Sequence, residues 1–311
     1  MKIIRVFPCR TKATPDDDLV FVGEPPAPLF GRAGFPETDE IHVSCTFTWD
    51  RQEAQRLAAA WSRFHPRVLL GGPAFPHIYQ VQACRGGHTM NMISANHWVG
   101  VFVPGLYLKR GYTITTRGCP NTCPWCLVPD REGPLRLLPI QPGHDVLDNN
   151  LLAAPQHHIR AVLRMLATQP RGARFTGGLQ ASLVAPWFVR EIGELRAAHK
   201  LDCLFLAYDR ESELDAVAES AAMFTQAGLR RWQMACYCLI GTPGDTPALA
   251  AARLDRIVQL GLQPFAMFYR GPDATTRSTP AEWRALVKKY IRPGATFATR
   301  GLKDADGTSR T

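Results

Sequence analysis

The second half of the chain shows the most regular pattern of hydrophobic and polar positions. From residue 111 onward, short apolar runs rich in β-branched and aromatic residues alternate with segments of helical period. In the segment that opens at Pro155, the apolar residues from Ile159 to Leu166 recur at the i, i+3, i+4 and i+7 positions of one helix face. The apolar runs predict six strands, at residues 112–118, 144–148, 173–180, 202–209, 235–241 and 265–270.

A helical segment follows each of these predicted strands except the first. The helices are expected after Pro155, after Pro186, around Leu214, at Thr246-Pro247 (a cap and first residue) and around Trp283 to Tyr290. Alternating strands and helices predict a parallel sheet with right-handed crossovers. Six strands are too few for a closed eight-stranded barrel, so we expect an α/β fold with a partial barrel, open on one side.

Polar residues and glycines stand where the predicted strands end. In parallel sheets ligands bind outside the carboxyl ends of the strands, so these residues predict one functional rim. Its members are Gly118, Cys119, Asp148 to Asn150, Gly177 to Gln180, Tyr208, Asp209, Gly241, Tyr269 and Arg270.

The first hundred residues predict a smaller α/β unit. Strands are expected at residues 2–7, 40–47 and 67–75. A helix is expected from about Asp50 to Phe64, with Asp50 as its N-cap. Residues 76–97 show no clear period, which favours a loop-rich insertion.

The expected domains are a small, degenerate Rossmann-like α/β domain at 1–105, a core at 106–270, and a C-terminal helix with a basic tail at 271–311. The formal net charge is +9. From residue 270 to the last residue, nine Lys and Arg stand against four Asp and Glu, a surplus of five. This surplus favours a polyanionic partner such as nucleic acid, although a solvated basic tail has the same composition.

The chain has no pattern typical of export or of membrane insertion. The N-terminal residues MKIIRVFPCRTK lack the long apolar region of a secretory signal. The longest mostly apolar run, from Trp98 to Leu108, is too short to cross a bilayer. We therefore expect a cytoplasmic protein without membrane contact, whose nine cysteines are thiols or metal ligands.

Three of these cysteines stand together in the stretch RGCPNTCPWCLVP, residues 117–129. Cys119, Cys123 and Cys126 have the spacing C-x3-C-x2-C. A structural zinc site normally takes four ligands, and the next histidine is as far away as His144. A thiol-redox pair would use only Cys123 and Cys126. An iron–sulfur cluster held by three thiolates would leave one iron open to an exogenous ligand.

The cysteine spacing, with an aromatic residue before the last cysteine, resembles the signature of the radical S-adenosylmethionine (AdoMet), or radical SAM, superfamily. The similarity extends over 106–270 and is to the branch related to cobalamin-binding enzymes and methylthiotransferases. It implies a (βα)6 partial barrel in which Cys119, Cys123 and Cys126 hold a [4Fe–4S] cluster whose fourth iron binds AdoMet. It also implies that reductive cleavage of AdoMet, with electrons from a flavodoxin- or ferredoxin-like donor, gives a 5′-deoxyadenosyl radical that abstracts hydrogen from the substrate.

The same resemblance implies the residues that contact AdoMet. Gly177 and Gly178 belong to a glycine-rich strand end similar to the one that lies against the methionine moiety, and YCLIGTPGDT resembles the segment that packs on adenine. At the position of Gln180, many family members have a carboxylate that binds the amino group of AdoMet. In this chain Asp148 or Asn150 could make that contact instead of Gln180. The implied cofactor-binding residues are Trp125, Gly177, Gly178, Gln180, Asp209, Ile240 and Gly241.

Several assignments stay open at the level of sequence. Cys236 or Cys238 could return a hydrogen atom to a substrate radical, or both could be buried apolar residues. Cys9, Cys45 and Cys84 are similar to the cysteines that hold a second cluster in methylthiotransferases. The substrate is expected to be a nucleoside or nucleic acid. The alternatives are a small metabolite or peptide, or a non-catalytic iron–sulfur binding protein.

Overall fold

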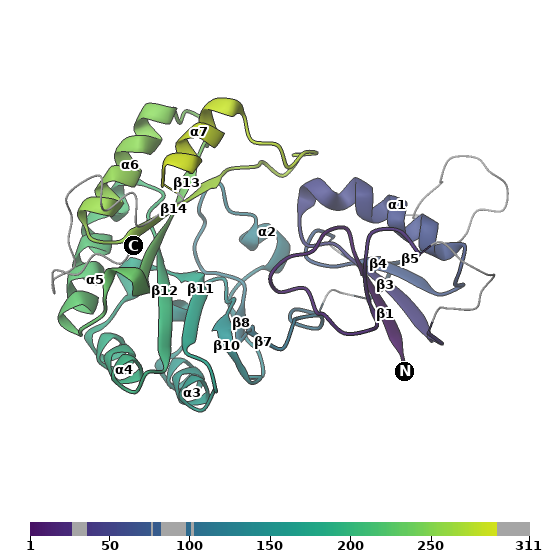
Figure 1. The fold of residues 1–311 in the computed structure, drawn as a ribbon, viewed down its shortest axis with the longest axis horizontal. Coiled ribbons are helices and arrows are strands. Elements are labelled where there is room, and N and C mark those ends of the chain that lie inside the picture. The colour runs from purple at the N-terminus through teal and green to yellow at the C-terminus, as the bar shows by residue number, and fades with distance from the viewer. Residues whose placement is uncertain (27–35, 76, 82–97, 101–102, 291–311) are drawn as a thin grey trace. The chain divides into compact units, whose positions relative to one another are not determined.

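The protein consists of two compact units in the computed structural model, which describes residues 1–26, 36–75, 77–81, 98–100 and 103–290 (Figure 1). The N-terminal unit comprises Met1–Arg110 and Pro272–Arg277. The C-terminal unit comprises Gly111–Gly271 and the described residues from Ser278 onward. The sequence led us to expect limits after residues 105 and 270.

The C-terminal unit is built on a six-stranded sheet whose neighbouring strands are all parallel. The strands follow one another across the sheet in chain order, which confirms the predicted α/β class with a parallel sheet. They are β7 (Gly111–Thr113), β10 (Gly143–Val146), β11 (Ala173–Leu179), β12 (Leu201–Ala207), β13 (Met234–Ile240) and β14 (Gln263–Phe268).

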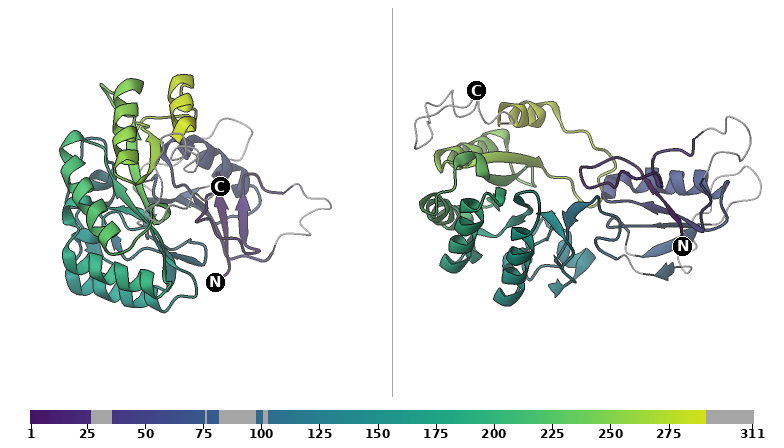
Figure 2. Two further views of the ribbon diagram at one scale, coloured as in Figure 1. Left: turned by 60° about the vertical axis from the view of Figure 1, so that its left-hand side comes forward. Right: turned by 60° about the horizontal axis from the view of Figure 1, so that its bottom comes forward.

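Helices cover one face of this sheet (Figures 1 and 2). Parallel strands added in chain order by crossovers of one hand place their helices on the same side. The predicted helix face of Ile159 to Leu166 is buried there, and Thr246 caps its helix by accepting a hydrogen bond from the Leu249 N–H at 3.3 Å. The helices are α3 (Gln156–Ala167), α4 (Pro186–Ala197), α5 (Leu214–Gln226), α6 (Pro247–Gln259) and α7 (Ala281–Tyr290).

The hydrophobic core of the C-terminal unit lies between the sheet and these helices. Phe188 of α4 packs edge-on against Phe175 of β11 and Phe224 of α5, with ring centroids 6.3 and 6.4 Å apart. All three rings are at most 1% exposed. Burial of each ring stabilises the fold by about 2 kcal/mol, so this core fixes the strands whose ends carry the predicted rim.

The N-terminal unit has a mixed sheet in the strand order β2-β1-β3-β4-β5-β6. The first four of these are parallel neighbours, and β5 and β6 are antiparallel. The strands are β1 (Ile3–Phe7), β2 (Val20–Val22), β3 (Glu40–Ser44), β4 (Val68–Gly71), β5 (Ile78–Val81) and β6 (Trp98–Gly100). Helix α1 (Arg51–Ser62) buries Leu57 and Trp61 in the core of this unit.

Two predictions for the N-terminal unit need correction. Asp50 does precede α1, but its side chain makes no capping hydrogen bond. The carboxylate instead accepts two hydrogen bonds from the guanidinium of Arg277, at 2.9 and 2.6 Å. Within the predicted loop, Ile78–Val81 form β5, in which only Val81 is buried, so four residues gave no periodic pattern. Residues 82–97 lie outside the described residues.

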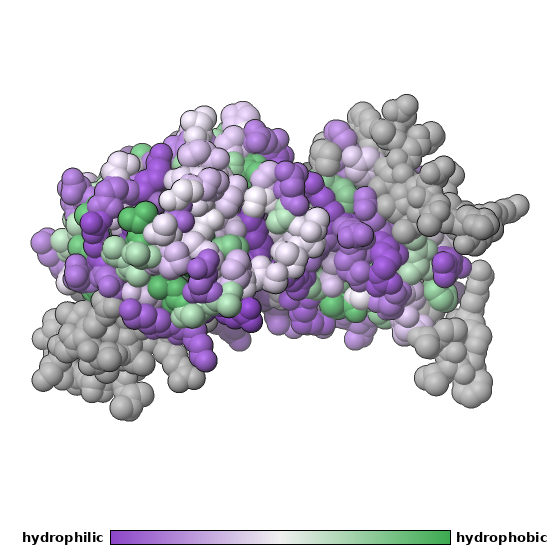
Figure 3. All heavy atoms as spheres, turned by 90° about the horizontal axis from the view of Figure 1, so that it is seen from above, coloured by the Kyte–Doolittle hydropathy of each residue, from purple (hydrophilic) through white to green (hydrophobic). Residues whose placement is uncertain are grey.

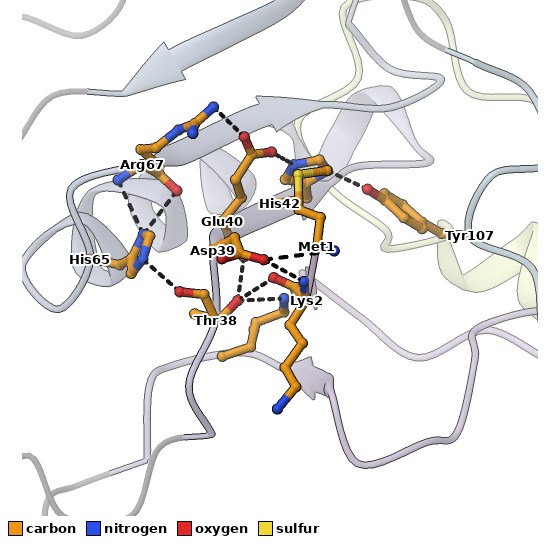
Figure 4. A network of polar contacts seen from close by, with 10 residues as sticks. Met1, Lys2, Thr38, Asp39, Glu40, His42, His65, Arg67 and Tyr107 are labelled. Carbon is orange, nitrogen blue, oxygen red and sulfur yellow. Dashed lines mark hydrogen bonds and ion pairs between the residues drawn. The ribbon is translucent and has the colours of Figure 1, made fainter.

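A polar network in the N-terminal unit surrounds Glu40, the buried first residue of β3 (Figure 4). One carboxylate oxygen lies 2.7 Å from Nε2 of His42, and the other binds the guanidinium of Arg67. The opposite ring nitrogen of His42 binds the hydroxyl of Tyr107. Burial raises the pKa of Tyr107 to about 12, so this hydroxyl is protonated at neutral pH. The network therefore fastens residue 107 to the start of β3.

Polar residues predominate among the coloured residues on the face drawn in Figure 3. On the face drawn in Figure 3, apolar residues lie in small groups among polar ones. Among the described residues, no helix has the length and apolar character needed to cross a membrane.

Candidate functional site

The three-cysteine segment is a loop closed by a short antiparallel ladder. The predicted strand 112–118 is interrupted: β7 ends at Thr113, and a separate strand, β8 (Thr116–Arg117), pairs with β9 (Arg136–Leu137). Between them lies a single short helix, α2 (Val128–Glu132), among the described residues. We call residues 118–135 the cysteine loop. The pairing of β8 with β9 holds the two ends of this loop side by side.

An ion pair and a close backbone approach reinforce this closure. Nε of Arg117 lies 3.3 Å from a carboxylate oxygen of Glu132, and both side chains are largely buried. Burial lowers the pKa of Arg117, and the neighbouring Glu132 opposes that effect. Gly118 has a φ of +80°, and a Cβ there would come within 2.1 Å of the Pro134 carbonyl oxygen. A side chain at this position would therefore open the loop.

Asp148, which follows β10, is hydrogen-bonded to Thr115, which lies between β7 and β8 ahead of the cysteine loop. Its carboxylate accepts hydrogen bonds from the N–H of Thr115 at 2.6 Å and from the Thr115 hydroxyl at 2.5 Å. The residue is only 1% exposed, and burial raises its pKa, which these hydrogen bonds oppose. Its oxygens are thus engaged by the protein. Asp148 has a structural role that accounts for its place at the rim.

A chain of side-chain amides joins the cysteine loop to the ends of β10 and β11. Oε1 of Gln180 accepts hydrogen bonds from the amide nitrogens of Asn121 and Asn150, both at 2.7 Å. The same Asn150 nitrogen lies 3.6 Å from Sγ of Cys119. A carbonyl oxygen has two lone pairs, so both acceptor positions of Gln180 are filled. Gln180, which stands where many family members have a carboxylate, therefore has its acceptor oxygen occupied by two donors from the protein.

The three loop thiols lie near enough to interact electrostatically with one another. Cys119 and Cys123 are half-buried and Cys126 is exposed. Desolvation of the thiol is the main cause that raises the pKa of Cys123 and of Cys126, whose sulfur is partly covered although the residue as a whole is exposed, and in both cases the neighbouring Cys119 adds to it. Arg210, which follows β12, lowers the pKa of Cys123 in turn. Among the described residues, no three His, Cys, Asp or Glu side chains are arranged as a metal site.

The donor set of the loop nevertheless suits an iron–sulfur cluster better than a single ion. A single tetrahedral ion needs four converging ligands, whereas a cubane takes each thiolate on a different iron and so keeps them farther apart. Thiolate sulfur also accepts hydrogen bonds, and such donors are present. The Val128 N–H points at Sγ of Cys126 at 3.5 Å, and Asn150 approaches Cys119. These donors would stabilise the anionic sulfurs.

The glycine pair at the end of β11 has a structural explanation in the sheet itself. A Cβ on Gly177 would come within 2.2 Å of the carbonyl oxygen of Asp148, so only glycine fits beside β10. Gly178 has a φ of +93°, and the strand register shifts between Phe175 and Leu179. The pair therefore forms a bulge that turns the chain toward Gln180.

The other predicted AdoMet contacts lie on neighbouring strand ends. Asp209, after β12, accepts a hydrogen bond from the Leu239 N–H at 2.6 Å, and burial raises its pKa. Ile240 is fully buried, and the N–H of Gly241 donates to Asp245 at 2.9 Å. Trp125 is half-buried within the cysteine loop. The structure thus shows protein partners for Asp209 and Gly241.

The remaining cysteines divide into two groups. Cys236 and Cys238 are fully buried in the core among the helices, and burial raises the pKa of Cys238 to about 12. This placement favours their role as apolar core residues over hydrogen donation to a ligand. In the N-terminal unit, Cys9 and Cys45 both lie near Asp50. Sγ of Cys9 is 3.5 Å from a carboxylate oxygen of Asp50. Cys84 lies outside the described residues.

The comparisons with known proteins add no relative. No protein-family model matches the chain, and neither the curated proteins nor the solved structures include one that is similar to it.

Proposed function

We propose that the protein is a radical SAM enzyme, with a (βα)6 partial barrel as its core. The observation that carries this proposal is the position of the cysteine loop. Cys119, Cys123 and Cys126 lie on a segment that follows the first strand of a six-stranded parallel sheet, with Asn150 and Gln180 of the next two strand ends in contact with it. Ligands of parallel α/β sheets bind at these carboxyl ends.

In this proposal the chain holds and shields a [4Fe–4S] cluster through Cys119, Cys123 and Cys126. The cluster, when bound with AdoMet and reduced by a flavodoxin- or ferredoxin-like donor, supplies the one-electron chemistry that yields a 5′-deoxyadenosyl radical. Asn150 and the Val128 N–H donate hydrogen bonds to the coordinating sulfurs. Such donors favour the thiolate form and bias the reduction potential of a cluster.

The AdoMet contacts of the proposal are Trp125, Gly177, Gly178, Gln180, Asp209, Ile240 and Gly241. Gly177 is exposed at the bulge, and glycine backbone without a side chain allows a ligand to approach closely. Binding of the AdoMet amino group at Gln180 requires that Asn121 or Asn150 release the amide oxygen, because that oxygen already has two donors.

The proposed substrate is a nucleoside or nucleic acid, and the proposed location is the cytoplasm. The net charge of +9 supports a polyanionic substrate. A small metabolite or a peptide is the alternative substrate, and a non-catalytic iron–sulfur protein is the alternative function. Binding of a polyanion weakens steeply as salt is added, whereas binding of a neutral metabolite does not.

Iron and acid-labile sulfide content test the proposal most simply. After anaerobic reconstitution, the wild-type chain is expected to hold about four irons and four sulfides, and AdoMet is expected to change the electron paramagnetic resonance of the reduced cluster. Cys119→Ala, Cys123→Ala and Cys126→Ala should each lose most of this iron. Cys203→Ala, a half-buried cysteine on β12 outside the loop, is the matched control and should retain it. Equal iron in all four variants would contradict the proposal.

A further inference from the structure

The sheet of the C-terminal unit has an aromatic row on the face opposite its helices. Phe205 of β12, Tyr237 of β13 and Phe265 of β14 stand on three neighbouring strands. Their neighbours in sequence, Leu204 and Cys236 among them, point into the buried core, so alternation places the rings on the other face. The Phe205 and Tyr237 rings are stacked, with centroids 4.6 Å apart and planes at 23°.

Part of this face consists of large apolar side chains that the fold leaves exposed. Phe265 is 49% exposed and Met267, two residues later on the same strand, is 37% exposed. Phe265 packs edge-on against Tyr237 at 5.3 Å between centroids, so its ring is held in place while much of its surface is open. Contiguous exposed apolar surface on a folded unit marks a site of interaction.

A fixed cation stands beside the aromatic row. Arg174 of β11 donates from Nε to Asp145 at 3.2 Å, and Asp145 in turn accepts from the hydroxyl of Thr176. The Asp145 side chain is only 6% exposed, whereas the Arg174 side chain is 37% exposed. Of the three guanidinium nitrogens of Arg174, Nε is the one that is hydrogen-bonded to another described residue. The ion pair orients the guanidinium, and its exposed part can reach an anion, although Asp202 and Cys203 also act on it electrostatically.

One hydrogen bond links Tyr237 of the aromatic row to β11, the strand that carries Arg174. The Tyr237 hydroxyl donates to the carbonyl oxygen of Thr176 at 2.8 Å, across the intervening strand β12. Thr176 directly precedes the bulge at Gly177 and Gly178. At about 3.3 Å per residue, Tyr237 lies about 13 Å before Gly241 along its strand. The aromatic row therefore lies on the same strands as the proposed AdoMet contacts, below their carboxyl ends.

We propose that this face binds single-stranded nucleic acid. Bases stack on the open ring of Phe265 with Met267 beside it, and Arg174 pairs with a backbone phosphate. Aromatic rings on a sheet together with a cation for the backbone are the usual means of binding unpaired strands. The net charge of +9 complements a polyanion rather than a neutral metabolite. That the bound strand is the substrate rests on the proposed function, but the binding itself does not.

Binding of a fluorescein-labelled, single-stranded oligonucleotide of about 12 nucleotides to the full chain tests this inference by anisotropy. Phe265→Leu keeps an apolar side chain but removes the ring, and it should weaken binding by about fivefold to a hundredfold. Arg174→Gln should weaken binding and reduce the slope of log affinity against log salt by about one.

Matched controls come from the same unit. Trp232→Leu removes an aromatic residue that is 48% exposed elsewhere, and Arg190→Gln removes an exposed arginine on α4. Both controls should bind the oligonucleotide nearly as the wild type does. Equal losses in the controls and in the face variants, or no binding at low salt, would overturn the inference. Adenosine monophosphate is added as a competitor at the same concentration of phosphate groups. If it displaces the oligonucleotide, the face binds a free nucleotide and not a strand, and the inference as stated is overturned.

The iron content of the same preparations separates this inference from the proposed function. Absence of oligonucleotide binding by a chain that assembles its cluster overturns this inference alone. Binding that is lost on Phe265→Leu in a chain that assembles no cluster supports this inference and overturns the proposed function alone.

Discussion

Asp148 accepts hydrogen bonds from both the backbone N–H and the hydroxyl of Thr115, at 2.6 and 2.5 Å. Thr115 lies between β7 and β8, so this contact stands where the predicted first strand is interrupted, ahead of the cysteine loop. Asp148 is a buried residue at the predicted ligand rim, yet its hydrogen-bond partners belong to the protein. The same contact thus explains both the interrupted strand and the burial of Asp148.

Replacement of Asp148 should destabilise the C-terminal unit. In Asp148→Ala the Thr115 N–H and hydroxyl lose their partner inside the fold, which should cost about 3 kcal/mol in the free energy of unfolding. Urea unfolding followed by tryptophan fluorescence measures this change. Asp215→Ala, an exposed aspartate on α5, is the control and should lie within about 1 kcal/mol of the wild type. A loss at Asp148 no larger than that of the control would show that the Thr115 contact does not stabilise the fold.

The two glycines of the β11 bulge should respond differently to alanine. Gly177→Ala places a Cβ 2.2 Å from the backbone oxygen of Asp148, which cannot move aside as a side chain could, so we expect a loss above about 3 kcal/mol. Gly178→Ala strains a φ of +93°, but among the described residues the Tyr237 ring alone comes near its Cβ, at 3.7 Å or more, so we expect about 1–2 kcal/mol. Thermal unfolding of both variants ranks them, and the reverse order would contradict this account of the bulge.

Gln180→Glu should tighten AdoMet binding if the amino group of AdoMet binds at this position. The wild-type amide oxygen is filled by Asn121 and Asn150, whereas a carboxylate has further acceptor positions and a negative charge. We expect about a tenfold lower Kd for AdoMet on the reconstituted protein, measured by equilibrium dialysis. Gln226→Glu adds the same charge at the exposed end of α5 and should leave the Kd unchanged. An unchanged or weaker affinity for Gln180→Glu would remove residue 180 from the AdoMet contacts.

The pH dependence of stability should report the environment of Asp145. Burial raises the pKa of this carboxyl, while Thr176 and Arg174 oppose the effect. A carboxyl whose folded pKa is raised stabilises the fold fully below its unfolded pKa, and this contribution is lost as pH rises through the folded pKa. The stability of Asp145→Asn relative to wild type should therefore rise as pH increases above the ordinary pKa of an aspartate, about 4. Urea unfolding across that range measures it, and a relative stability that falls with pH would indicate a lowered pKa instead.

The strands from β11 onward and the helices that follow them were predictable because each is long or strongly periodic. The face from Ile159 to Leu166 and the cap at Thr246 are local patterns, and both are confirmed. The break after Thr113 was not predictable, since it depends on Asp148, which is distant in sequence. The short strand β5 was missed for a related reason: its pairing with β4 stabilises it more than its own four residues do.

The candidate site shows the same division between local and distant information. The cysteine spacing is visible in the sequence, but the polar partners of the loop are not. Asn121 lies inside the loop, between Cys119 and Cys123, and its position there was the one sequence signal of a role. Its contact with Gln180 joins residues 59 positions apart, and the closure by Arg117 and Glu132 needs the β8–β9 ladder. Such contacts follow from the fold and not from spacing.

Formation of 5′-deoxyadenosine tests the central claim most directly. The reconstituted wild-type chain is incubated anaerobically with AdoMet and dithionite, and the product is quantified by liquid chromatography beside Cys123→Ala and Cys203→Ala. The account predicts 5′-deoxyadenosine from the wild type and Cys203→Ala, and none above background from Cys123→Ala. No product from a wild-type chain with a full cluster, even with the oligonucleotide present as candidate substrate, would contradict it and would favour a non-catalytic iron–sulfur protein.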